Sequence, residues 1–212
     1  MSLGSFKRIL VFAPHTDDGE LGCGGTIAKA VEDGATVTYV AFSSADKSLP
    51  KGFPKGTLKE ELLKATHILG IPKENVVCYE YEVRRFSHHR QEILEDMHRL
   101  KNELNPELVF APSLNDLHQD HKIVAEECRR IFKRTTMLGY EMPWNNISFD
   151  TFAFSVLKKE HVMKKIEALQ CYKSQQHKEY FQENFIESLA ITRGVQINAR
   201  YAEAFEVVRW II

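Results

Sequence analysis

Residues 9–25, ILVFAPHTDDGELGCGG, pass from a short apolar run into a turn that holds one histidine and three acidic residues. The apolar run, residues 9–13, is typical of a parallel strand buried on both faces. The turn then falls at the carboxyl end of that strand, which is the edge of an open α/β sheet where ligands bind. A polar turn whose aspartates only cap the next helix is the alternative, but a cap requires one such residue. The composition of the turn predicts a metal site.

Length and composition favour one α/β domain spanning residues 1–212. A chain of this length buries about 70% of the surface that its unfolded form exposes. Its 28 basic and 29 acidic residues give a net charge of -1, which provides no surplus charge for binding nucleic acid or an anionic membrane. No apolar run approaches the roughly 20 residues of a membrane span. We expect residues 1–4 to be an appended or disordered segment.

The four cysteines, Cys23, Cys78, Cys128 and Cys171, form no Cys-x-x-Cys pair. Their spacing therefore indicates neither a disulfide framework nor a thiolate zinc site. We expect a cytoplasmic protein, because thiols stay reduced in that compartment. The sequence leaves the oligomeric state open, and a homo-oligomer is compatible with it.

Extended apolar runs alternate with helical periodicity, which is typical of a Rossmann-like, doubly wound α/β fold with a mostly parallel sheet and helices on both faces. Strands are predicted at residues 9–13, 36–42, 76–79, 108–111, 137–141, 151–156 and 204–212. Helices are predicted after the acidic turn up to Gly34, at residues 58–69, from a Ser87 cap through Leu104, at residues 123–132 and at residues 162–169.

A second polar cluster, PSLNDLHQDH at residues 112–121, follows the strand predicted at residues 108–111. Two such turns at the ends of two strands can converge. His15, one aspartate of the first turn and one histidine of the second would supply two nitrogens and one oxygen. Three ligands of this kind together with a water form the open tetrahedral site of hydrolytic zinc.

Spacing alone does not divide the roles within the two turns. Asp17 and Asp18 are neighbours and point in different directions, so one can bind metal while the other faces the water. Either His118 or His121 taken singly is typical of a surface imidazole at a helix start. The two histidines together, with aspartates beside them and core elements on both sides, favour a site.

The two turns resemble the signatures of the PIG-L / LmbE-like deacetylase family, which are a His-Pro-Asp-Asp turn after the first strand and a later His-x-Asp-His turn. Here they read His15-Thr16-Asp17-Asp18 and His118-Gln119-Asp120-His121. Weaker matches follow in order at Leu21 to Gly25, Tyr140-Glu141 with Pro143, Ser174-Gln175, Arg193-Gly194 and Tyr201 to Phe205. The resemblance implies a Rossmann-like, zinc-dependent enzyme that removes the N-acetyl group from an N-acetylglucosamine-like sugar or sugar conjugate.

Carried over by motif position, the resemblance implies that His15, Asp18 and His121 bind one Zn²⁺ per chain, with another divalent metal as the alternative. Zinc lowers the pKa of a bound water from about 15.7 to about 7 and polarises a carbonyl, as amide hydrolysis requires. The resemblance further implies that Asp17 is the general base and acid. It assigns to His118 the stabilisation of the oxyanion, as an imidazolium oriented by Asp120, and we expect Asp120 to raise the pKa of His118.

Departures from the family pattern concern the substrate. Thr16 replaces the usual proline, and Leu58 and Lys59 stand where the thiol-sugar deacetylases carry an arginine, which disfavours a sugar-thiol precursor. The candidates for substrate binding are Arg84, Arg85, Trp144 and Arg193. The two adjacent arginines could bind a hydroxyl or a phosphate, or be solvated charges. Trp144 could be a sugar-stacking wall or core.

Two other classes of protein share some of these sequence features. A dinucleotide-binding oxidoreductase is suggested by Gly22-Cys23-Gly24 after the first strand, but Ile27 stands where the third glycine of the fingerprint belongs. The acidic turn would also repel a pyrophosphate. The second alternative is a non-catalytic, metal-dependent sugar-binding protein, and the apparent base Asp17 argues against it. No dinucleotide cofactor is therefore expected.

Overall fold

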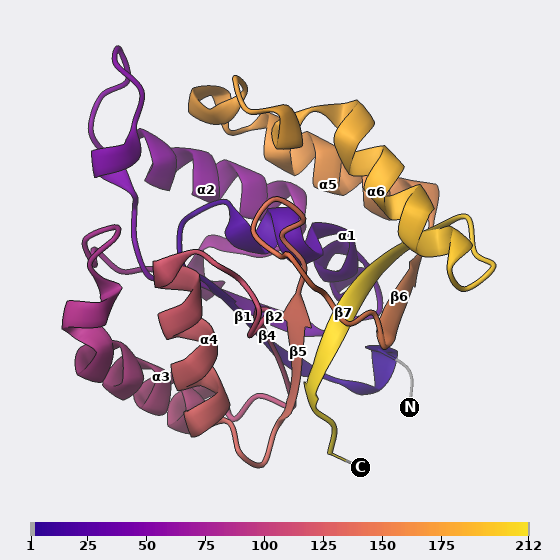
Figure 1. The fold of residues 1–212 in the computed structure, drawn as a ribbon, viewed down its shortest axis with the longest axis horizontal. Coiled ribbons are helices and arrows are strands. Elements are labelled where there is room, and N and C mark those ends of the chain that lie inside the picture. Colours follow the sequence, from indigo (N-terminus) through magenta and orange to yellow (C-terminus); the bar gives the residue numbers. More distant parts are fainter. Residues whose placement is uncertain (1–2, 212) are drawn as a thin grey trace.

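The computed structural model describes residues 3–211, which form one seven-stranded sheet with helices on both faces (Figure 1). The strands are β1 (Arg8–Ala13), β2 (Thr36–Ala41), β3 (Val76–Cys78), β4 (Leu108–Pro112), β5 (Thr136–Tyr140), β6 (Ala153–Leu157) and β7 (Tyr201–Arg209). The helices are α1 (Asp18–Glu32), α2 (Thr57–Ile68), α3 (Arg90–Leu104), α4 (Gln119–Ile131), α5 (Lys159–Gln170) and α6 (Glu183–Val195). The doubly wound α/β prediction is confirmed.

Within residues 3–211 the strand order is β3-β2-β1-β4-β5-β7-β6, and β7 runs antiparallel to the other six strands. From β1 the chain moves outward to β2 and β3, then returns across the sheet to β4 on the other side of β1. This reversal makes the space beyond the carboxyl ends of β1 and β4 a topological switch point, where open α/β sheets bind ligands. Both polar turns begin at these two strand ends.

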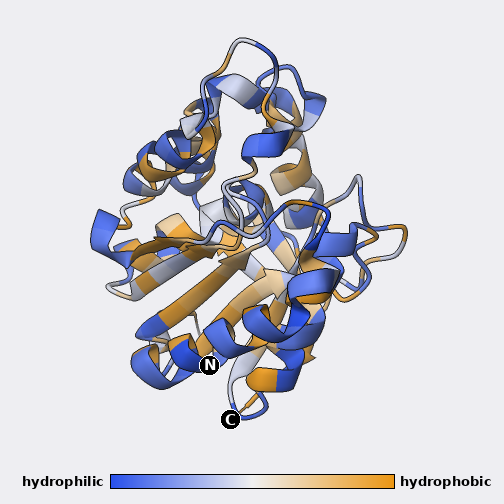
Figure 2. Cartoon of the chain, turned by 90° about the vertical axis from the view of Figure 1, so that its left-hand side faces the viewer, coloured by the Kyte–Doolittle hydropathy of each residue, from blue (hydrophilic) through white to orange (hydrophobic). Residues whose placement is uncertain are grey.

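Two apolar clusters, one on each face of the sheet, form the core. The first lies under α1, α2, α5 and α6, and the second lies under α3 and α4 (Figure 1). Figure 2 shows the central strands as hydrophobic and the helices as hydrophilic on their outward sides. Each central strand is buried almost throughout, which explains its continuous apolar sequence.

Close packing of α1 on the sheet depends on its glycines. An added Cβ on Gly22 would lie 2.3 Å from the ring of Tyr140, and one on Gly19 would lie 2.5 Å from the ring of Tyr39. These glycines therefore serve helix–sheet contact and not the approach of a pyrophosphate. Where the two halves of α1 meet, Cys23 has non-helical dihedrals, and the buried Glu203 carboxylate accepts hydrogen bonds from the N–H groups of Gly25 and Thr26.

Some boundaries differ from the prediction. Ser87 does not cap α3, because residues Phe86–His89 form a separate 3-10 turn and the helix begins at Arg90. Helix α6 was not predicted. The last strand begins at Tyr201 and ends at Arg209, and residue 212 lies outside the described residues. At the other end Leu3–Ser5 form a short 3-10 turn, and residues 1–2 lie outside the described part of the chain. Within residues 3–211, no helix has both the length and the apolar content needed to span a membrane.

Candidate metal and catalytic site

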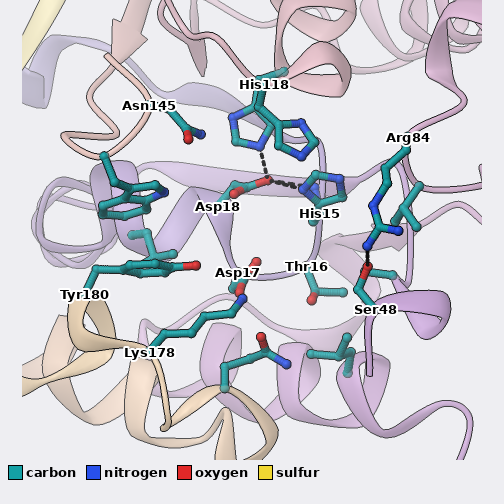
Figure 3. A pocket seen from close by; sticks show the side chains of 17 residues that line it. His15, Thr16, Asp17, Asp18, Ser48, Arg84, His118, Asn145, Lys178 and Tyr180 are labelled. Atoms are coloured by element: carbon teal, nitrogen blue, oxygen red, sulfur yellow. Dashed lines mark hydrogen bonds and ion pairs between the residues drawn. The ribbon is translucent and has the colours of Figure 1, made fainter. Parts of the chain in front are cut away.

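Three side chains from the two polar turns converge at the carboxyl ends of β1 and β4 (Figure 3). The Oδ2 atom of Asp18 lies 3.1 Å from Nδ1 of His15 and 3.2 Å from Nε2 of His121. Asp18 and His121 are buried, and His15 is nearly so. The arrangement offers two imidazole nitrogens and one carboxylate oxygen to a common point. That donor set suits Zn²⁺ and related divalent ions.

The far nitrogen of each of these histidines faces another buried carboxylate. Nε2 of His15 lies 3.1 Å from Oδ2 of Asp120, and Nδ1 of His121 lies 2.7 Å from Oδ2 of Asp116. Metal-binding histidines are commonly oriented in this way, because the carboxylate fixes the ring and the tautomer. The structure therefore places each imidazole between a carboxylate partner and the point at which the three donors meet, which is the environment that a resident metal requires.

The charges of the group are also matched to a cation. Burial works against protonation of His15, but Asp18 and Asp120 outweigh it and raise the pKa of His15 to about 9. For His121, burial is likewise outweighed by Asp18 and Asp116, and the pKa is raised to about 10. Burial would raise the pKa of Asp18, yet the two histidines hold it well below its usual value. The aspartates create a site where positive charge is favoured, as protons or as a metal ion.

His118 differs from the sequence expectation in its partner and in its charge. The Asp120 carboxylate binds His15 and the backbone N–H groups of Arg84 and Phe86, and it does not accept a hydrogen bond from His118. Instead, Nδ1 of His118 accepts from the backbone N–H of Asp120 at the start of α4. Burial, His121 and His15 lower the pKa of His118 to about 4. The Asp120 charge acts to raise the pKa of His118, as expected, but burial and the two other histidines outweigh it. With Nδ1 accepting, His118 has only Nε2–H to donate, and its role as an oxyanion donor stays a prediction.

Asp17 lies beside this group in a cavity of about 240 Å³. Burial and the neighbouring Asp18 carboxylate raise its pKa, and Lys178 opposes that shift. For Lys178, partial burial is outweighed by Asp17, and the pKa of the lysine is raised. Figure 3 shows the Lys178 side chain reaching toward Asp17. A carboxyl whose pKa is moved up from its usual range can both accept and return a proton.

A buried cluster of Glu20, Tyr39 and Tyr172 contacts the first polar turn from the protein interior. The hydroxyl of Tyr172 contacts the carbonyl of Thr16 at 2.7 Å and the Glu20 carboxyl at 2.9 Å, and Tyr39 contacts the same two groups. These four oxygen–oxygen contacts need more protons than two tyrosine hydroxyls carry, which favours a neutral Glu20. Burial raises the pKa of Glu20 to about 8. The peptide between His15 and Asp17 is therefore fixed from the protein interior.

The cavity includes part of the predicted substrate-binding set and excludes the rest. Arg84 and Trp144 line it. Arg85 does not, and its side chain is 58% exposed near Glu82. Arg193 pairs with Glu141 away from the cavity, since a bidentate partner holds its guanidinium. Lining residues that the sequence did not indicate include Ser48, Asn145, Lys178 and Tyr180, whereas Gln175 belongs to a weak motif match.

The unpredicted residues come from irregular segments. Lys178 and Tyr180 lie between α5 and α6, where no periodic pattern marks them, and Tyr180 stacks on Trp144 with 3.9 Å between ring centroids. The Ser174-Gln175 pair was a weak motif match and was the one available signal in that segment. Trp144 is 38% exposed, so it is part of the cavity wall and not plain core.

Fold and site together define a class of protein, the α/β proteins with a metal-binding group at the carboxyl ends of two parallel strands. The sequence profile of the PIG-L family, described as GlcNAc-PI de-N-acetylase, matches residues 10–132, which is more than half of the chain. This chain belongs to the PIG-L family. The matched segment contains both polar turns and all three converging donors.

Individual relatives show how far the similarity extends. A probable N-acetyl-alpha-D-glucosaminyl L-malate deacetylase 2 of Bacillus anthracis is 29% identical over 186 residues, covering 80% of this chain and 81% of the relative. The solved structure of N,N'-diacetylchitobiose deacetylase from Pyrococcus horikoshii is similar with a TM-score of 0.76 at 21% identity, covering 95% of this chain and 84% of that chain.

The fold by itself does not determine the reaction. The structure of GalB, the 4-carboxy-2-hydroxymuconate hydratase from Pseudomonas putida KT2440, is similar with a TM-score of 0.78 at 20% identity, covering 97% of this chain and 98% of that chain. A deacetylase and a hydratase thus share this architecture. Family membership and the site residues, and not the fold, therefore indicate which reaction this chain catalyses.

Proposed function

We propose that this protein is a zinc-dependent N-deacetylase that removes the acetyl group from an N-acetylglucosamine-like sugar or sugar conjugate. The observation that carries the proposal is the convergence of His15, Asp18 and His121 beside the cavity carboxyl Asp17. Membership of the PIG-L family supports the reaction, and the sugar deacetylases among the similar proteins support the substrate class.

His15, Asp18 and His121 would hold the metal, through the nitrogen and oxygen atoms that already face one another. When bound, zinc would lower the pKa of a water at the site and polarise the acetyl carbonyl. Asp116 and Asp120 would fix the two histidine rings from behind. Another divalent ion with the same ligand preference could replace zinc in cells.

Asp17 is the general base in this proposal. It would take the proton from the attacking water and deliver it to the nitrogen of the leaving amine, for which its raised pKa suits it. Lys178, beside it, would favour the carboxylate form that Asp17 has before the first proton transfer and regains after the second. His118 would donate from Nε2–H to the oxyanion that forms when the water attacks the acetyl carbon; such a donor is typically worth about 3 to 4 kcal/mol.

Trp144 and Tyr180 would form the wall against which the sugar ring packs, because aromatic rings offer a broad apolar face with a polar edge. The proposed compartment remains the cytoplasm, which the four free cysteines support. The proposed site does not depend on the oligomeric state, since every proposed metal ligand comes from one chain.

The test is a panel of N-acetylated amino sugars, incubated with the zinc-loaded protein, in which acetate and free amine are both measured. We expect acetate and amine in equal amounts from at least one sugar. A protein that binds these sugars and releases no acetate would be the non-catalytic binder. Nicotinamide or flavin binding, followed by cofactor fluorescence, would instead support the oxidoreductase alternative.

A further inference from the structure

Arg84 is held in an unusual backbone conformation at the edge of the cavity. Its φ is 65°, in the left-handed region that non-glycine residues avoid, and its backbone N–H donates to Oδ2 of Asp120 at 2.6 Å. Asp120 is fully buried and also contacts His15. The carboxylate that orients a proposed metal ligand therefore also fixes the position from which the Arg84 side chain enters the cavity. Strained residues of this kind cluster at functional sites.

A second strained residue lies in another segment that lines the same cavity. Ala45 has a φ of 55°, lines the cavity and precedes the 3-10 turn Asp46–Ser48. Within residues 3–211, the remaining non-glycine residues with positive φ are Asn105 and Asn198, and asparagine tolerates that region. The strained alanine carries Ser48 to the cavity, where its Oγ lies 3.3 Å from a guanidinium nitrogen of Arg84.

The guanidinium of Arg84 has no acidic partner. In the described part of the chain no carboxylate lies within 4.0 Å of it, and Ser48 is its one side-chain hydrogen bond. Arg193, by contrast, is fully engaged by Glu141. An arginine that lines a cavity, with a serine hydroxyl as the one side-chain partner of its planar set of N–H donors, is suited to bind a phosphate or carboxylate from a ligand.

Two further lysines that have no ion pair with a described residue lie in the surroundings of Arg84. A neighbouring cavity of about 630 Å³ shares Val83 with the site cavity and is lined by the loop that follows Ala45. Its acidic residues are engaged: Asp46 by a backbone N–H, Glu80 by Ser44 and Lys59, and Glu82 by Lys47. Two of its lysines, Lys51 and Lys55, have no ion pair among residues 3–211. Helix α2 also begins here without a capping side chain, and Leu58 lines the site.

We propose that Arg84 and Ser48 form an oxyanion-binding subsite, and that the substrate is an N-acetylated amino sugar bearing a phosphate. The inference rests on the proposed deacetylase function and specifies its substrate. A phosphate carries close to two negative charges, which matches Arg84 together with the unpaired lysines of the adjoining cavity better than a single carboxylate does. A longer group, such as a diphosphate, would extend from Arg84 toward Lys51 and Lys55.

The test compares kcat/KM for N-acetylglucosamine with that for its 1-phosphate and its 6-phosphate. For the unchanged protein we expect one phosphorylated sugar to be preferred by roughly tenfold or more, as charge-assisted hydrogen bonds allow. Arg84→Gln should reduce that preference by about 10- to 100-fold. Arg84→Lys should restore only part of it, because lysine keeps the charge but loses the planar donor fork.

Arg85→Gln is the matched control, since Arg85 is the adjacent arginine, lies outside the cavity and is exposed. Its preference should equal that of the unchanged protein. Acetate release without a preference for either phosphate, or equal preferences in the Arg84→Gln and Arg85→Gln variants, would overturn the subsite and leave the deacetylase proposal standing. A carboxylated N-acetyl sugar used as well as the phosphates would overturn the choice of phosphate.

A second readout does not depend on turnover. Calorimetric titration of the metal-free protein with N-acetylglucosamine 1-phosphate and 6-phosphate should show the tighter ligand binding at least about tenfold more weakly to Arg84→Gln than to Arg85→Gln. If no sugar releases acetate but this difference in affinity is found, the deacetylase proposal fails and the subsite holds. Equal affinities in the two variants would overturn the subsite.

Discussion

Neighbouring groups act in opposite directions on the protonation of Asp17, as the proposed pair of proton transfers requires. Burial and Asp18 favour its neutral form, whereas Lys178 and His15 favour the carboxylate. A group balanced in this way can hold a proton after taking it and release it when the amine leaves. The neighbouring Asp18 is instead held ionised by two histidines, so the structure gives the adjacent aspartates different chemistry.

We therefore predict that Asp17→Asn keeps its metal and lowers kcat by roughly 10² to 10⁴-fold, the usual worth of a positioned acid or base. Elemental analysis of the variant measures the bound metal, and steady-state kinetics on the best sugar of the panel measure kcat. Loss of metal with the activity would show that the roles of Asp17 and Asp18 have been exchanged.

A second prediction concerns the carboxylates behind the histidines. Asp116→Asn and Asp120→Asn should each weaken zinc binding by about 10- to 100-fold, because each removes the acceptor that orients a ligand ring. Competition with a chelator measures the affinity, and Asp150→Asn, at an exposed aspartate, is the control. If Asp120→Asn bound zinc normally and changed only the pH dependence of kcat, Asp120 would act on His118 and not as the group that orients the ligand His15.

The sequence indicated the residues of the two turns, because polar residues that follow an apolar strand can be recognised from the sequence alone. It could not indicate which histidine each aspartate contacts. Asp120 lies one residue from His121 and two from His118, yet its carboxylate turns toward His15, more than a hundred residues away. That choice depends on side-chain rotamers and on the path of the 84–86 backbone, neither of which has a sequence pattern.

The element on which the site depends most is the turn that enters α1. Glu20, Tyr39 and Tyr172 close around the carbonyl of Thr16 and fix the peptide between His15 and Asp17. Glu20 lies at the start of α1, Tyr39 in β2, and Tyr172 in the segment after α5. The turn that carries His15 and Asp17 is thus held by residues from distant parts of the chain.

This cluster makes stability depend on pH. The pKa of Glu20 is about 8 in the folded protein against 4.5 ordinarily, so the folded state retains a proton that the unfolded state loses. The stabilisation is complete below pH 4.5 and is lost as pH rises toward 8, at up to about 1.4 kcal/mol per pH unit. Urea unfolding at several pH values should show a steeper decline for the unchanged protein than for Glu20→Gln. Parallel curves for the two proteins would mean that Glu20 is ionised in the fold.

Secondary structure was predictable where the apolar pattern was strong. The central strands and α1, α2, α4 and α5 lie close to their predicted positions. Helix α6 was missed because its buried face consists of Ile186, Ala190 and Gly194, and two of these are too small to make an apolar pattern stand out. The start of α3 was placed too early because Ser87 lies in a 3-10 turn that precedes the helix.

Across the whole molecule, the strand order brings the two turns together. Parallel pairing of β1 with β4 sets their carboxyl ends side by side. From β1 the chain crosses over toward β2, and from β4 it crosses over in the opposite direction, toward β5. The fold class and the sheet edge could be predicted from the alternation of elements. The adjacency of β1 and β4 could not, because strand order depends on the packing of helices on the two faces, which local sequence does not specify.

We propose that His15, Asp18 and His121 form one metal site on which deacetylation with Asp17 as the base depends. The decisive test is to titrate metal-stripped protein with zinc while following acetate release from an N-acetylated amino sugar. We expect the rate to rise linearly and to reach its plateau at one equivalent of zinc per chain, and we expect no such rise for His121→Ala. Full activity in the stripped protein, or an unchanged titration in His121→Ala, would show that these residues do not form the metal site of the reaction.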